Sequence, residues 1–137
     1  VIEYNCRFGD PETQVVLPLL ESDLFGIMKS VADGTLSAEQ VKFSDKSACC
    51  VVMASDGYPQ KYDSGFEITM PADKNIYVAG AKLADGKLLT AGGRVLGVTE
   101  TADTLANAVA KAYETVKTVN FENAYYRKDI GKKALEV

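Results

Sequence analysis

The sequence predicts an α+β fold, in which the end of one domain (residues 1–46) precedes a small antiparallel-sheet domain with one packed helix (residues 47–137). Three observations support this. A continuous apolar run at 48–54 is short enough for a buried strand. Asp85-Gly86, between two short apolar runs, is a strong hairpin signal. Apolar residues from Leu105 to Val119 recur at helical spacing and predict a core-facing helix.

We expect one strand and two helices within residues 1–46. Apolar and polar side chains alternate over residues 1–7, which is typical of a strand. Gly9-Asp10-Pro11-Glu12 predicts a helix start, with Asp10 as the cap and Pro11 in the first turn, and Pro18 keeps that helix short.

Ser22 is the expected cap of the second helix, which should run to about Asp33 before Gly34 ends it. The polar stretch 35–46 is the expected domain boundary.

The second domain should contain short strands and one long helix. Asp103 is the expected helix cap. The expected strands are residues 47–55, 65–69, 75–83, 87–91 and 94–101, with a closing strand and loop within 120–130.

Composition and charge exclude two classes of partner. Acidic residues outnumber basic ones by 19 to 15, so the chain offers no basic field to a nucleic acid. No apolar run approaches the ~18 residues that a membrane span requires. We therefore expect neither a nucleic-acid partner nor a membrane partner.

The cysteine and histidine content limits the kinds of site that the chain can form. Cys6, Cys49 and Cys50 make a poor disulfide framework, and no zinc-ligand spacing is present, so we expect reduced thiols in a cytoplasmic protein. The chain has no histidine, the usual proton shuttle at neutral pH. Because Val1 stands where a predicted strand has already begun, we expect the chain to be a fragment.

Glu3, Asn5 and Arg7 form the sharpest candidate constellation. Alternate residues of a strand point the same way, so one surface would carry a carboxylate, an amide oxygen and a guanidinium. Carboxylate and amide oxygens suit Mg²⁺, and a guanidinium suits a transferring phosphoryl group. From spacing alone, the polar outer face of an ordinary half-buried strand explains the pattern better.

The longer context of these residues resembles the glycinamide ribonucleotide synthetases of the ATP-grasp superfamily. We call residues 3–14 the signature segment, because their sequence resembles that family's signature. Further matches follow in the family's order and cover nearly the whole chain: Gly57-Tyr58-Pro59, Gly80-Ala81-Lys82, Gly92-Gly93-Arg94-Val95-Leu96-Gly97-Val98-Thr99 and Tyr125-Tyr126-Arg127-Lys128-Asp129-Ile130-Gly131. Lys132-Lys133 departs from the pattern, at positions where relatives often carry histidine and arginine.

The resemblance implies an ATP-dependent ligase of purine biosynthesis. ATP would phosphorylate glycine, and 5-phosphoribosylamine would then attack the acyl phosphate. Residues 1–46 would be the end of an ATP-grasp domain, with Glu3 and Asn5 as ligands of Mg²⁺ or Mn²⁺ and Arg7 as a catalytic residue. A histidine-free site suits this chemistry, which relies on positioning and charge neutralisation. The fragment alone is expected to be inactive.

Asp10, Glu12 and Arg94 are the expected substrate-binding residues. Each has a structural alternative: Asp10 as a helix cap, Glu12 as a first-turn carboxylate that complements the helix dipole, and Arg94 as a surface or structural arginine.

Two other functions stay open. One is a non-enzymatic interaction or scaffold module, and the other is another ATP-grasp ligase such as a carboxylase. The continuation from Phe8 to Glu12 argues against the carboxylase.

Overall fold

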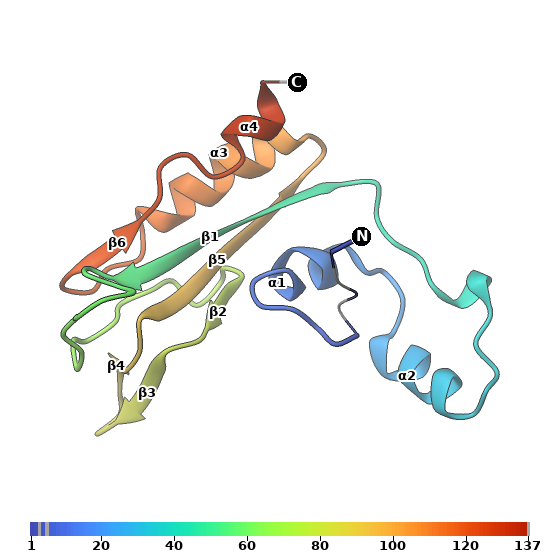
Figure 1. The fold of residues 1–137 in the computed structure, drawn as a ribbon, viewed down its shortest axis with the longest axis horizontal. Coiled ribbons are helices and arrows are strands. Elements are labelled where there is room, and N and C mark those ends of the chain that lie inside the picture. Colours follow the sequence, from blue (N-terminus) through green and yellow to red (C-terminus); the bar gives the residue numbers. More distant parts are fainter. Residues whose placement is uncertain (3, 5, 137) are drawn as a thin grey trace.

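A four-stranded antiparallel sheet organises the C-terminal two thirds of the chain (Figure 1). The computed structural model describes all residues except 3, 5 and 137. The strand order is β2-β5-β1-β6, with β1 (Ser47–Ser55) and β5 (Arg94–Ala102) as the long central pair. Both central strands confirm the sequence prediction. Their pairing runs from Ser47 opposite Ala102 to Ala54 opposite Arg94, with a bulge between Met53 and Ala54.

The edge strands are short, and a separate hairpin follows β2. β2 (Ile76–Val78) pairs with β5, and β6 (Ala124–Tyr126) pairs with the end of β1. β3 (Ala81–Ala84) and β4 (Lys87–Thr90) form the predicted hairpin around Asp85-Gly86, both of which have positive φ. The predicted strand 65–69 is reduced to isolated bridges at Glu67 and Thr69.

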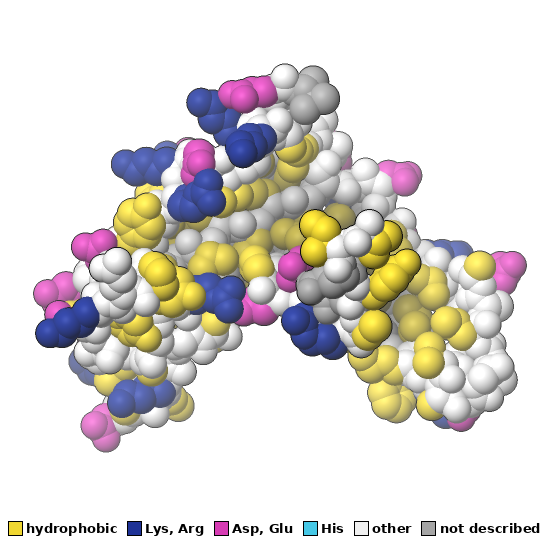
Figure 2. Space-filling model, viewed as in Figure 1, with side chains coloured by type: hydrophobic (Ala, Val, Ile, Leu, Met, Phe, Trp, Pro, Cys, Tyr) yellow, Lys and Arg dark blue, Asp and Glu magenta, His cyan; other side chains and the backbone are white. Residues whose placement is uncertain are grey.

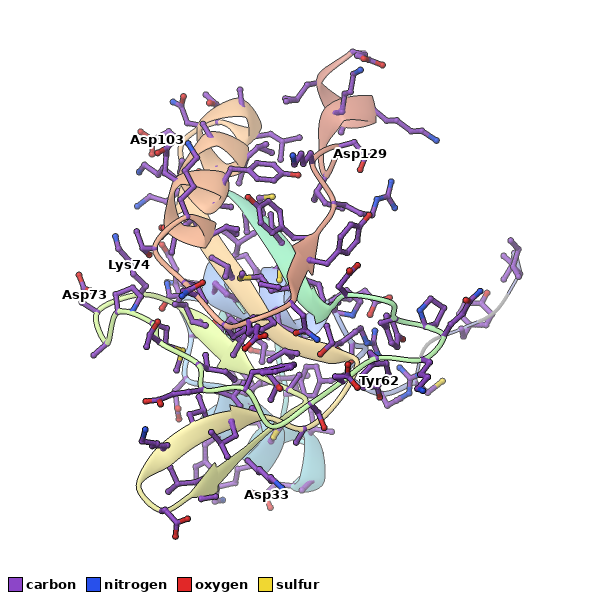
Figure 3. All side chains as sticks on the ribbon, turned by 90° about the vertical axis from the view of Figure 1, so that its left-hand side faces the viewer. Asp33, Tyr62, Asp73, Lys74, Asp103 and Asp129 are labelled. Atoms are coloured by element: carbon purple, nitrogen blue, oxygen red, sulfur yellow. The ribbon has the colours of Figure 1, made fainter. Side chains whose placement is uncertain are left out.

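Helix α3 (Leu105–Val116) covers one face of the sheet (Figure 1). Its cap is Thr104, whose hydroxyl accepts a hydrogen bond from the Asn107 amide at 3.3 Å, so the prediction of Asp103 was one residue early. Figure 3 shows Asp103 beside the start of the helix. The core lies between helix and sheet: Cys49, Val51, Met53, Ile68, Val95, Leu96, Val98, Ala102, Ala108, Ala112, Val116, Val119 and Phe121.

The C-terminal segment packs back against α3 through Tyr113. The Tyr113 hydroxyl donates to the carbonyl of Arg127 at 2.8 Å and accepts from the amide of Ile130 at 3.0 Å. Asp129, labelled in Figure 3, pairs with Arg127 in the same segment. A short helix, α4 (Lys132–Leu135), follows and was not predicted.

The N-terminal segment lies beside the sheet, and its described residues form short helices (Figure 1). They are α1 (Thr13–Val16), a 3₁₀ turn (Leu17–Leu19), α2 (Leu24–Ala32) and a second 3₁₀ turn (Ala38–Gln40). The 3₁₀ turn contains Pro18 and confirms the expected break.

Three N-terminal predictions need correction. The described residues among 1–8 form no strand. Helix α1 begins at Thr13, so Asp10 is not its cap. The cap of α2 is Asp23, which accepts from the Gly26 amide at 2.8 Å, whereas Ser22 accepts from Lys42.

No helix in the described part of the chain is long and apolar enough to cross a membrane.

Candidate functional site

Arg94 is the first residue of β5, and its backbone is closely packed against neighbouring segments. Its carbonyl accepts from the amide of Gly80 at 2.8 Å, and the preceding carbonyl of Gly93 accepts from the amide of Ser55 at 2.8 Å. The hydroxyl of Ser55, which is fully buried, donates to the carbonyl of Gly92 at 3.1 Å. A β-carbon on Gly80 would lie 2.5 Å from the Arg94 carbonyl oxygen, so the two backbones approach too closely for any side chain there.

Arg94 reaches the signature segment through an ion pair with Asp10. Its Nη2 lies 3.0 Å from Asp10 Oδ2. The other oxygen, Oδ1, accepts from Gln14 Nε2 at 2.8 Å, so Asp10 holds both a guanidinium and an amide. Two of the three predicted substrate residues are therefore in direct contact, although they lie far apart in the sequence.

Helix α1 rests on the sheet face opposite α3. Glu100 faces α3, because its carboxylate accepts from Thr115 Oγ1 at 2.6 Å. Gly97 is an odd number of residues away on the same strand, so its position faces the other side. A β-carbon there would lie 3.8 Å from Gln14 Cγ and 3.2 Å from Cys50 Sγ. The missing side chain thus lets the helix that carries Gln14 approach β5.

Cys50 lies under this contact. Burial raises its pKa, and the negative charge of Asp10 adds to the shift. Burial also raises the pKa of Cys49, on the opposite face. Neither thiol therefore has the lowered pKa of a nucleophilic cysteine.

Three hollows border α1 and the residues just before it. One, of about 400 Å³, is lined by Pro11, Glu12 and Val15 together with residues of β1, α3 and the C-terminal segment. The other two contain Asp10 and Arg7, respectively. The larger, a groove of about 520 Å³, lies between α1 and β2, with Asp10 and Gln14 on one side and residues 77–79 on the other. The smaller, of about 260 Å³, is lined by Arg7, Phe8, Gly9, Glu12, Thr13 and Val16. Arg7 and Glu12 thus share the smaller of these two hollows, and Asp10 lines the larger one, whereas Arg94 lines neither.

Glu3 and Asn5, the expected metal ligands, lie outside the described residues. Among the residues that are described, no group of three or more acidic, cysteine or histidine side chains is placed to hold a metal ion. A carboxylate and an amide oxygen remain suitable donors for Mg²⁺ or Mn²⁺ by their chemistry.

Two contacting residues were not singled out as site residues by sequence reasoning. Gln14 belongs to the signature segment and follows Asp10 by one helical turn, a spacing that places the two side chains together. Tyr58 lies in a stretch already noted as a family match, and its ring covers Gly93 immediately before Arg94.

Comparisons with known proteins cover almost the whole chain. A phosphoribosylamine–glycine ligase of Fusobacterium nucleatum is 46% identical over 96% of this chain and 32% of its own length. A bifunctional purine biosynthetic protein of Schizosaccharomyces pombe is 51% identical over 98% of this chain and 18% of its own. The chain therefore spans about a third or less of the length of these relatives.

A solved structure gives the same result for the fold. The crystal structure of phosphoribosylamine–glycine ligase from Thermotoga maritima matches with a TM-score of 0.85 and 41% identity, over 95% of this chain and 33% of that one. The α+β fold with small antiparallel sheets is confirmed by this match. The family model for the phosphoribosylglycinamide synthetase C domain matches residues 48–133. The chain belongs to the phosphoribosylglycinamide synthetase family, whose C domain these residues form.

Proposed function

We propose that this chain is the C-terminal part of an ATP-dependent ligase that joins glycine to 5-phosphoribosylamine. The γ-phosphoryl group of ATP passes to the glycine carboxylate and ADP leaves. The amine of 5-phosphoribosylamine then attacks the acyl carbon, forms the amide bond and expels phosphate. The free cysteines suit a reducing compartment, and we place the enzyme in the cytoplasm.

The ion pair between Asp10 and Arg94 supports the proposal independently of family membership. It joins the signature segment, which carries the expected metal ligands, to the first residue of β5. A C-terminal domain that only served as an interaction module would have no need to place a cation against the signature segment.

Arg94 and Asp10 would have different roles in substrate binding. Arg94 presents five N–H donors, and its pairing with Asp10 uses one nitrogen of a side chain that is 44% exposed. The remaining donors suit a substrate carboxylate or phosphate. Asp10 orients that guanidinium and contributes a carboxylate at the rim of the larger groove.

Arg7 and Glu12 line the smaller hollow with opposite charges, an arrangement that suits a small zwitterion such as glycine. Arg7 would also offset the negative charge of the transferring phosphoryl group. When bound, Mg²⁺ or Mn²⁺ held by Glu3 and Asn5 would neutralise phosphate charge.

Residues 1–46 are proposed to be the end of the ATP-grasp domain. Helix α2 has an amphipathic sequence, yet none of its residues is buried. Figure 2 shows hydrophobic side chains at the surface of this N-terminal segment. The remaining two thirds of the ligase would supply the surface that covers them.

The test uses the full-length ligase, in which this chain is joined to the N-terminal part that its relatives possess. Glu3→Ala and Asn5→Ala should each abolish most activity and weaken activation by Mg²⁺, with Glu122→Ala as an exposed carboxylate control. Unchanged activity in both variants would refute the proposed metal site. Absence of glycine- and phosphoribosylamine-dependent ADP release by the wild-type enzyme would refute the function itself. The 137-residue chain alone should release no ADP.

A further inference from the structure

Tyr58 occupies the space that a side chain at position 93 would need. A β-carbon on Gly93 would lie 2.0 Å from Tyr58 Cδ2 and 2.5 Å from Cε2, so the ring lies directly on the backbone of Gly93. Gly93 immediately precedes Arg94. The ring therefore packs against the peptide from which the Arg94 side chain departs.

The loop that carries Tyr58 is held in place by its backbone. The Tyr58 amide donates to the Ser55 carbonyl at 3.1 Å, and the Gln60 amide donates to the Gly57 carbonyl at 2.8 Å. Gly57 has a φ of 93°, and a β-carbon there would lie 2.3 Å from the Lys61 carbonyl oxygen. The tight turn therefore requires glycine.

Further contacts join the same loop to the rest of the sheet domain. Asn123 donates from its side-chain nitrogen to the Asp63 carbonyl at 3.2 Å, and its own carbonyl accepts from the Asp56 amide at 2.8 Å. Tyr62, labelled in Figure 3, lies in this loop, edge-on to Tyr58 with ring centroids 6.1 Å apart. The loop that carries the Tyr58 ring is thus held to the sheet domain, although Tyr58 itself is 43% exposed.

We propose that Tyr58 is a positioning residue of the ligase reaction: its ring holds Gly93, and through it Arg94, where the guanidinium reaches both Asp10 and the substrate anion. This inference rests on the proposed function. A guanidinium has many rotamers, and an exposed ion pair alone restrains it weakly. A backbone fixed between the Gly80 contact and the Tyr58 ring limits the positions that the Arg94 side chain can take.

A double-mutant cycle in the full-length ligase tests the proposal. Tyr58→Ala should raise the KM for glycine or for phosphoribosylamine about tenfold, with a smaller change in kcat. In an Arg94→Ala background the same change should have little further effect, because its target is gone. Tyr58→Phe should behave as wild type, and Tyr125→Ala, an exposed tyrosine on β6, is the matched control. Independent, multiplicative effects of Tyr58→Ala and Arg94→Ala would overturn the proposal, as would unchanged kinetics.

A second variant and a second readout separate this proposal from misfolding and from the proposed function. Gly93→Ala should displace the ring and reproduce the Tyr58→Ala kinetics, with the far-UV circular dichroism of the wild type. In the 137-residue chain, the ¹⁵Nε–H NMR signal of Arg94 should move on Tyr58→Ala and on Asp10→Asn, but not on Tyr125→Ala. This measurement needs no ligase activity. An Arg94 signal that responds to Asp10→Asn but not to Tyr58→Ala would contradict the role of Tyr58, whatever the reaction.

Discussion

The two regions of this chain differ in what they bury. Residues 47–136 contain all the core side chains that the structure describes, packed between α3 and the four-stranded sheet. No described residue among 1–46 is buried, and Phe25 and Val31 of α2 are 74% and 58% exposed. The sheet domain therefore has its own hydrophobic core, whereas apolar side chains of α2 in the N-terminal segment stay exposed.

The largest expected effect tests the core. Leu96 is 1% exposed in the middle of β5, so Leu96→Ala should lower the free energy of unfolding by about 2–5 kcal/mol through lost burial and a residual cavity. Leu83→Ala is the matched control, because Leu83 is 76% exposed on β3. Urea denaturation of the 137-residue chain measures both. Equal effects at the two sites would contradict the position of the core.

The next effect distinguishes the chain from the full-length ligase. Phe25→Ala should change the stability of the 137-residue chain by less than about 0.5 kcal/mol, because the ring is exposed there. In the full-length ligase the same change should cost about 1.5–3 kcal/mol, if the missing part covers α2. A comparable small effect in both proteins would show that the exposed face of α2 stays exposed.

A smaller effect tests how the C-terminal segment is held. Tyr113→Phe removes the hydroxyl that bridges Arg127 and Ile130, at an expected cost of about 0.5–1.5 kcal/mol for each hydrogen bond. Tyr126→Phe is the control, since Tyr126 packs against Tyr113 with ring centroids 6.3 Å apart and its hydroxyl makes no hydrogen bond to a described residue. Thermal unfolding of the two variants compares them directly, and a larger loss for Tyr126→Phe would argue against the bridge.

Sequence reasoning succeeded where local signals agree with the tertiary context. The apolar run of β1, the Asp85-Gly86 hairpin and the apolar stripe of α3 were all predicted, because burial on the sheet reinforces each local preference. The caps of α2 and α3 were displaced by one residue, since neighbouring polar side chains compete for the same role: at α2, Asp23 caps the helix and Ser22 accepts from the amide of Lys42.

The misses have a different physical origin. A strand at residues 1–7 needs a partner for its backbone groups, and alternation of side chains does not supply one. The Asp10–Arg94 ion pair depends on how α1 lies across β5, which is a property of the packed chain. The resemblance indicated which candidate residues to expect. It did not show that Arg7 and Glu12 line one hollow while Asp10 lines another.

The smallest expected effect concerns the link between the two regions. Asp10 and Arg94 are both about half exposed, so Arg94→Ala should cost only about 0.2–1 kcal/mol of stability in the 137-residue chain, and less at high salt. Urea denaturation at two salt concentrations measures it, with Lys117→Ala as a control from another exposed pair. A loss of several kcal/mol would mean that the pair is a structural anchor and not a restraint on the site.

Amide hydrogen exchange tests the central contrast most directly, because it reports each region separately. In the 137-residue chain, the amides of β1, β5 and α3 should exchange slowly, and those of α1 and α2 should exchange orders of magnitude faster. Joining the chain to the N-terminal part of the ligase should slow exchange in α1 and α2 and leave the sheet domain unchanged. Strong protection of α1 and α2 in the isolated chain, or none in the full-length ligase, would contradict the account.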